Sequence, residues 1–175
     1  MRIEWEQEVS LPGMSLALDF SLLALVADCC AVCEKVPVQT AVHVLITDDL
    51  HIQEVNRAQR GIDRATDVLS FPTVNYPQGK TARTSLRALR RELDPDLNAC
   101  FVGDILISRE HATAQAAEYG HSIRREFCYL LAHGLFHLFG YDHLLPEDQK
   151  EMRTMEEKAL QLAGVTRDGF TTALP

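Results

Sequence analysis

A short segment in the C-terminal half of the chain concentrates histidine in a spacing that strongly constrains the local fold. Residues 133–143 read HGLFHLFGYDH and hold three of the seven histidines. His133 and His137 are four residues apart, so on a helix both rings lie on one face about one turn apart. Gly140 allows a sharp turn after that helix, and His143 then returns as a third ligand. Three imidazoles with one open coordination position are typical of a catalytic zinc site.

The expected metal is one zinc ion per chain, with nickel, cobalt or iron as alternatives for this ligand set. The competing interpretation is that the three histidines are ordinary core and cap residues. The segment is rich in leucine and phenylalanine, and burying imidazoles there without a partner costs roughly a few kcal/mol. A bound metal offsets that cost, so we expect a metal site.

The same spacing occurs in metzincin peptidases, whose pattern places three histidines and a glycine at these intervals. Those peptidases carry a glutamate directly after the first histidine, where it acts as the general base. Here that position is Gly134, which cannot transfer a proton. A metzincin-like peptidase therefore stays open only as an alternative that lacks its base.

The order of hydrophobic patterns predicts an α+β fold with one domain over residues 1–164 and a C-terminal tail over 165–175. Two strand-like segments follow each other without a helix between them, which favours an antiparallel pair in a mixed sheet. We expect a four-stranded sheet with about five helices packed on it, one of them the metzincin-like metal-binding helix. The expected strands are 1–9, 42–46, 67–71 and 100–108. The expected helices are 15–34, 49–59, 109–119, 122–140 and 146–163, with a short basic helical piece over 84–93.

Charge is unevenly distributed along the chain. The 175 residues carry a net charge of −8, which by itself argues against a nucleic-acid partner. The span 57–91 nevertheless holds eight basic residues against two acidic ones, a local excess that attracts phosphates. A merely solvated basic face is the other interpretation. The basic residues are Arg57, Arg60, Arg64, Lys80, Arg83, Arg87, Arg90 and Arg91.

Cysteine count and hydropathy bear on the compartment. Five cysteines are an odd number, and the first residues are acidic rather than basic, so we expect reduced thiols and no signal peptide. Cys30 and Cys33 have the spacing of a redox or metal pair, but in an apolar helical stretch they more often pack as small hydrophobes. No apolar run reaches the ~18 residues that span a bilayer. The expectation is a cytoplasmic protein with no membrane partner.

Four segments together resemble the YbeY family of bacterial endoribonucleases and rRNA maturation factors. They read NRAQR at 56–60, TDVLSFP at 66–72, GDILIS at 103–108 and HGLFHLFGYDH at 133–143. Two departures from the family pattern stand out: Ala65 occupies a position that is usually proline, and the span 73–99 is longer than usual. The second departure affects the expected shape of the substrate groove rather than the metal site.

The resemblance implies a metal-dependent endoribonuclease specific for single-stranded RNA. It implies a role in rRNA maturation, including processing of the 16S rRNA 3′ end, and in ribosome quality control. The expected partners are single-stranded rRNA and the small ribosomal subunit or its proteins. The metal ligands it implies are His133, His137 and His143, and the essential arginine is Arg60. Ser70 and Arg57 are the candidate substrate-binding residues.

The sequence leaves further alternatives open. Attack on the phosphodiester by the RNA 2′-hydroxyl and attack by water are both compatible with these residues. A non-catalytic, zinc-containing ribosome-assembly factor is the main competing function, although three ligands instead of four argue against a purely structural zinc. Asp67, Asp104 and Asp142 are candidates for orienting the ligand imidazoles through their free N–H groups. Two alternatives stay open: Asp67 stabilises the turn before its strand, and Asp142 caps the loop in which it lies.

Overall fold

The structure is a computed structural model that describes residues 1–7, 18–36, 39–166 and 169–170. A mixed sheet forms its centre, with strand order β1-β2-β5-β3 and the short β4 beside β5. β1, β2 and β5 run parallel, while β3 and β4 pair antiparallel with β5. The strands are β1 (Arg2–Gln7), β2 (Thr40–Thr47), β3 (Val68–Pro72), β4 (Leu93–Asp94) and β5 (Ala99–Ser108).

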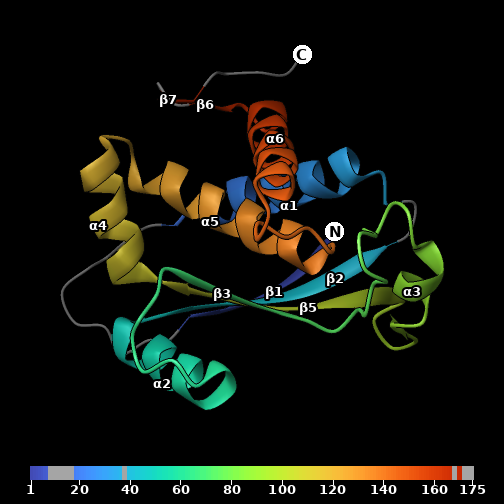
Figure 1. Ribbon diagram of the computed structural model, residues 1–175. Helices are drawn as coiled ribbons and strands as arrows, with labels where there is room; N and C mark the ends of the chain where they lie inside the picture. Colours follow the sequence, from blue (N-terminus) through green and yellow to red (C-terminus); the bar gives the residue numbers. More distant parts are fainter. Residues whose placement is uncertain (8–17, 37–38, 167–168, 171–175) are drawn as a thin grey trace.

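Helices cover the sheet unequally (Figure 1). α1, α5 and α6 lie on one side of it, α2 lies on the other side, and α4 lies at one end. α5 is the central helix of the core, because most of its residues are buried and the phenylalanines Phe127 and Phe136 are fully enclosed. The helices are α1 (Phe20–Glu34), α2 (Asp49–Arg60), α3 (Leu86–Arg90), α4 (Arg109–Tyr119), α5 (Ile123–Leu138) and α6 (Pro146–Leu162).

Polar caps fix where the helices begin. The side chains of Asp48, Ser108 and Ser122 each accept a hydrogen bond from the backbone N–H three residues on, as expected for N-cap residues. Gly61 ends α2 in the left-handed conformation, which places Arg60 in the last turn of that helix. The end of α2 is therefore fixed where the candidate site residue Arg60 lies.

The α+β class and the antiparallel pair of β3 and β5 are confirmed. The sheet has five strands rather than four, and the described residues form six helices rather than about five. Both α3 and β4 lie in the span 73–99. α3 falls within the short basic helical piece expected over 84–93 and is anchored by fully buried Leu89, whereas the two-residue β4 is too short for an alternating pattern to reveal it.

Two ends of the chain differ from the expected ranges. α1 begins at Phe20 after the N-cap Asp19, whereas residues 15–17, at the expected start of this helix, lie outside the described residues. Within the expected tail, Val165–Thr166 (β6) pairs antiparallel with Gly169–Phe170 (β7).

The five cysteines are free and buried, so Cys30 and Cys33 pack in the core as predicted. Among the described residues, no helix combines the length and the apolar character needed to cross a bilayer.

Candidate metal centre

The three histidines of the sequence motif converge at the C-terminal end of α5. His133 and His137 lie one turn apart, and their Nε2 atoms are 3.1 Å from each other. The His143 ring lies 5.6 Å from the His133 ring and 4.9 Å from the His137 ring, centroid to centroid. Each histidine offers a ligand nitrogen, and all three nitrogens lie within 4.8 Å of one another. The predicted ligands therefore form one cluster.

The turn that returns His143 to the helix depends on Gly140. Its φ is +92°, a conformation that side chains disfavour. A Cβ atom there would lie 2.7 Å from the Tyr76 ring and 2.9 Å from the carbonyl oxygen of Lys80. Glycine thus satisfies both the backbone conformation and the close approach of the segment from the span 73–99.

Two acceptors fix the tautomers of the helix histidines. Nδ1 of His133 lies 2.7 Å from the carboxylate of Glu156 on α6, and Nδ1 of His137 lies 3.1 Å from the carbonyl oxygen of Tyr141. A carboxylate and a carbonyl only accept hydrogen bonds, so both Nδ1 atoms carry the proton. Both Nε2 atoms then present lone pairs to each other, and a cation between them fits where a hydrogen bond cannot form.

His137 is neutral at ordinary pH. Burial, and then the neighbouring His133, lower its pKa from 6.5 to about 4. A metal ligand must be unprotonated, so this imidazole binds a cation without first losing a proton. The donor set, three imidazoles with two fixed tautomers, suits zinc or a similar divalent ion.

A pocket of about 690 Å³ joins this cluster to α2 and β3. All three histidines line it, together with Arg60 and Ser70. The Arg60 guanidinium donates to the backbone carbonyl of Ser70 at 3.1 Å and lies 5.6 Å from the centre of the Phe71 ring. The cation and the histidine cluster thus face one cavity, which can accommodate an anion beside a metal.

Ser70 and Arg57 differ in their placement. Ser70 is buried and lines the pocket, so it is placed where a substrate contact is feasible. Arg57 is exposed on α2 and is not among the described residues that line the pocket. Its role in substrate binding stays a prediction.

Gly134 faces the sheet instead of the pocket. A Cβ atom at this position would lie 2.9 Å from Cδ1 of Ile105 and 3.1 Å from Oγ of Ser70. The glycine lets α5 pack closely on β3 and β5, so the position that carries a glutamate base in metzincins is filled here by strand side chains.

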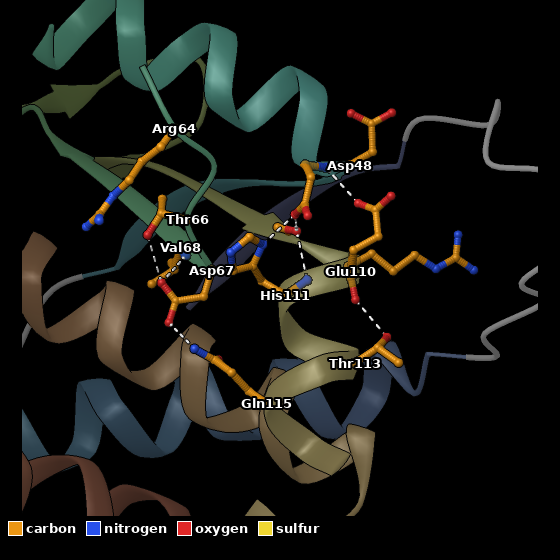
Figure 2. A network of polar contacts seen from close by, with 12 residues as sticks. Asp48, Arg64, Thr66, Asp67, Val68, Glu110, His111, Thr113 and Gln115 are labelled. Carbon is orange, nitrogen blue, oxygen red and sulfur yellow. Dashed lines mark hydrogen bonds and ion pairs between the residues drawn. The ribbon is translucent and has the colours of Figure 1, made fainter. Parts of the chain in front are cut away.

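Two of the aspartates expected to orient the imidazoles have other partners. Asp67 accepts hydrogen bonds from the Val68 amide at 2.8 Å, the Thr66 hydroxyl at 3.0 Å and the Gln115 amide at 2.9 Å (Figure 2). Burial by itself raises the pKa of Asp67, but these hydrogen bonds hold it below its usual value. Asp104 pairs with His43 at 3.1 Å.

The third aspartate, Asp142, accepts a hydrogen bond from the backbone N–H of His143 at 2.7 Å, which makes it a turn residue. The residue that does contact a ligand ring, Glu156, was missed by the sequence reasoning. The sequence does mark this residue in one way: an acidic side chain lies on the same helical face as the apolar residues Met152, Met155 and Ala159, which the structure buries.

Most of the chain is similar to proteins of one family. The family model described as Endoribonuclease YbeY matches residues 17–164. A protein of that name from Acetivibrio thermocellus is 42% identical over 135 residues, which cover 77% of this chain and 80% of the relative. Another from Roseiflexus is 38% identical over 159 residues, covering 90% of this chain and 92% of the relative.

A solved structure also matches the fold. The solution structure of a Thermotoga maritima protein has a TM-score of 0.52 and 22% sequence identity, and it covers 91% of this chain and 89% of that chain. At this identity the match supports the fold alone. The family model and the relatives together show that the chain belongs to the YbeY family.

Proposed function

We propose that this chain is a metal-dependent endoribonuclease that cuts single-stranded RNA. The observation that carries the proposal is the single pocket that is lined by both the three-histidine cluster and Arg60. The relatives that match most of the chain are named as endoribonucleases. We extend the proposal to zinc as the metal, and to 16S rRNA 3′-end maturation and ribosome quality control in the cytoplasm as the biological role.

In this proposal Arg60 binds the scissile phosphate. Its guanidinium is held by the Ser70 carbonyl and the Phe71 ring, while its other N–H groups can donate to two non-bridging oxygens. Lysine cannot reproduce that planar fork. A divalent metal on the three histidines would supply Lewis-acid chemistry next to this phosphate. Removing a stabiliser of transition-state charge typically lowers the rate about 10²- to 10³-fold.

The number of ligands supports catalysis over a purely structural metal. Among the described residues, the histidine, cysteine and acidic side chains that gather here are three, not four. A closed structural zinc site needs four protein ligands, whereas a catalytic one keeps a position open. This favours an enzyme over a non-catalytic zinc-containing assembly factor.

RNA is favoured over a peptide substrate by two features. Gly134 is packed against β5 and offers no general base. The span 73–91 carries Lys80 and four arginines, all exposed, and none of these five forms an ion pair with a described carboxylate. The backbone N–H of Ala82 in this span donates to the carbonyl oxygen of Phe139 at 2.9 Å. The exposed cations therefore lie on a segment that is bonded to the turn over 139–143, which we call the metal turn because it carries His143.

The test is cleavage of a single-stranded RNA that carries the 3′ end of precursor 16S rRNA, with its duplex form as a control. Zinc-loaded wild type is compared with His137→Ala and Arg60→Ala, and with Arg2→Ala as a matched removal of an exposed arginine on the far edge strand. We expect wild type and Arg2→Ala to cut the single strand. Arg60→Ala should retain its zinc and lose cleavage, and His137→Ala should lose both. Equal cleavage by all four proteins would contradict the proposal.

A further inference from the structure

A second pocket opens next to the metal pocket, between α4, α5 and α6. It has a volume of about 600 Å³ and shares two wall residues, Asp67 and Tyr129, with the metal pocket. The Tyr129 ring lies 6.1 Å from the His133 ring, centroid to centroid. An RNA strand bound in the metal pocket therefore has a second cavity directly beside it, which a neighbouring nucleotide of the strand can enter.

Gln115, one of the residues that line this second pocket, carries an unused hydrogen-bond acceptor. Nε2 of Gln115 donates to Oδ2 of Asp67 at 2.9 Å (Figure 2). Because a carboxylate only accepts, the amide nitrogen must face Asp67 and the carbonyl oxygen must face away from it. That oxygen is buried and has no hydrogen-bond partner among the described residues. A buried acceptor without a partner is unfavourable, and a ligand N–H would satisfy it.

A second lining residue with acceptor oxygens, Glu126 on α5, lies among charged groups of both signs. The Glu126 side chain is 3% exposed and lies 3.0 Å from Nε2 of His121. Burial raises the pKa of Glu126 to about 7. Two arginines and three carboxylates line the pocket, and Arg125 already donates to the Thr166 carbonyl. Such a lining suits a polar, uncharged group better than a phosphate.

The rim provides a flat apolar surface. Tyr119, the last residue of α4, is 62% exposed, and its ring lies 6.0 Å from the His121 ring. An exposed aromatic ring beside polar groups that can hydrogen-bond a base edge is the arrangement by which proteins bind unstacked bases of single-stranded RNA.

We propose that this second pocket binds one nucleobase of the RNA strand whose phosphate occupies the metal pocket. The inference rests on the proposed endoribonuclease function. Gln115 Oε1 and the Glu126 carboxyl group each offer an acceptor oxygen. An exocyclic amino group has two N–H donors and can serve both acceptors, whereas the pairing edge of uracil has a single N–H and can serve only one. The pocket therefore prefers adenine, cytosine and guanine over uracil. Tyr119 stacks on the base.

The first experiment measures binding of non-cleavable 2′-O-methyl RNA hexanucleotides by fluorescence anisotropy. Tyr119→Ala should weaken binding about 5- to 100-fold, because stacking on one aromatic side chain accounts for such a factor. Tyr119→Phe keeps the ring and should bind like wild type. Leu50→Ala, which removes a 68% exposed side chain from α2, is the control for removal of exposed apolar surface and should also bind like wild type.

The second experiment varies one base in the hexanucleotide at a time. At one position, wild type should bind adenine, cytosine or guanine about 3- to 10-fold more tightly than uracil, the range of one net hydrogen bond. Gln115→Met and Glu126→Gln should each reduce this preference. Two variants are used because Gln115 also contacts Asp67, and thermal unfolding reports whether either one is misfolded.

Hydrolysis of bis(p-nitrophenyl) phosphate, which has no base, separates this inference from the proposed function. It should be equal in wild type and Tyr119→Ala. If wild type neither hydrolyses this ester nor cuts RNA, the endoribonuclease proposal fails even where Tyr119-dependent binding persists. If Tyr119→Ala binds every hexanucleotide like wild type, or no position discriminates against uracil, the nucleobase pocket is refuted while the nuclease stands.

Discussion

The carboxylate of Glu156 and Nδ1 of His133 are 2.7 Å apart, although 23 residues separate them in the sequence. Glu156 is buried on α6, and its side chain reaches the His133 ring on α5. This contact keeps the proton on Nδ1 and directs Nε2 toward the other histidines. α6 therefore takes part in the candidate metal centre without supplying a ligand.

Replacing Glu156 by glutamine should weaken metal binding without removing a ligand. The amide retains an oxygen acceptor but loses the charge, and removal of such a partner typically lowers metal affinity about 10- to 100-fold. Competition for zinc with a chromophoric chelator measures the affinity. Glu147→Gln, at the exposed start of the same helix, should match wild type. Equal affinity in Glu156→Gln and wild type would show that the contact has no role in binding.

A second buried carboxylate ties the metal turn to the span 73–99. Glu34 at the end of α1 is fully buried, accepts from the Tyr141 hydroxyl at 2.6 Å, and accepts from the Arg83 backbone N–H at 2.8 Å. Burial and the Glu34 contact raise the pKa of Tyr141 above its usual value, so the phenol stays protonated and keeps donating. Tyr141 also supplies the carbonyl oxygen that accepts from His137.

Glu34→Ala should destabilise the fold by about 2–4 kcal/mol, because it leaves a buried hydroxyl and a backbone N–H without their acceptor. Urea denaturation of the metal-free protein measures the change. Tyr141→Phe should be destabilised less, by about 1–3 kcal/mol, since only one donor is removed. Tyr119→Phe, on an exposed ring, is the matched control and should have no effect. Wild-type stability in Glu34→Ala would contradict the anchoring role.

The parts of the site that sequence could predict are those encoded locally. His133, His137, Gly140 and His143 fall within eleven residues, so helical periodicity and one glycine turn suffice to bring them together. The helix caps at Ser108 and Ser122 are equally local, because each contact spans three residues.

The contacts that sequence did not predict join distant elements. Glu156 on α6 contacts the His133 ring, and Glu34 on α1 contacts the Tyr141 hydroxyl. The residues next to these glutamates in the sequence do not indicate which partner each will contact. Asp67 and Asp104 illustrate the converse error, because their positions near the motifs suggested that they would orient the ligand histidines. The fold instead satisfies them with Gln115 and His43.

Introducing the missing glutamate of the metzincin pattern should not create a peptidase. Gly134→Glu would force a charged side chain between α5 and β5, where even a Cβ atom lies 2.9 Å from Ile105. Overpacking alone typically costs about 1–3 kcal/mol, and an unpaired buried charge adds to that. We expect a lowered melting temperature and no cleavage of casein. A stable variant with peptidase activity would show that the position opens to the pocket.

The metal-free protein should lose stability as the pH falls from about 6.5 to about 4. The pKa of His137 is near 6.5 in the unfolded chain and about 4 in the fold, chiefly because the ring is buried. In this window the unfolded chain binds a proton that the folded chain does not, so acid favours unfolding. Thermal unfolding of EDTA-treated protein measures the effect. His137→Gln removes the titrating group and should show a shallower dependence, whereas identical profiles would contradict this account.

Removing the exposed arginines of the span 73–91 should reduce the salt dependence of RNA binding. Arg87 and Arg90 lie three residues apart on α3 and so share a face. Arg91 directly follows this helix and Arg83 precedes it; all four side chains are exposed, while Leu89 is buried. For a single strand, each phosphate that the protein no longer neutralises lowers the slope of log K against log salt by about 0.7. A quadruple glutamine variant should therefore lower the slope by up to about 3.

A matched variant distinguishes a local RNA contact from a change in net charge. Glutamine at Arg2, Lys35, Lys150 and Lys158 removes the same number of exposed cations from other elements. Because screened charges act over about 10 Å at 0.1 M salt, this control should change the slope much less than the α3 variant. Anisotropy titrations of one single-stranded RNA from about 50 to about 300 mM salt compare the two. Equal slopes in both variants would mean that the four arginines in and beside α3 are only solvated, and that the RNA leaves the metal pocket over a different surface.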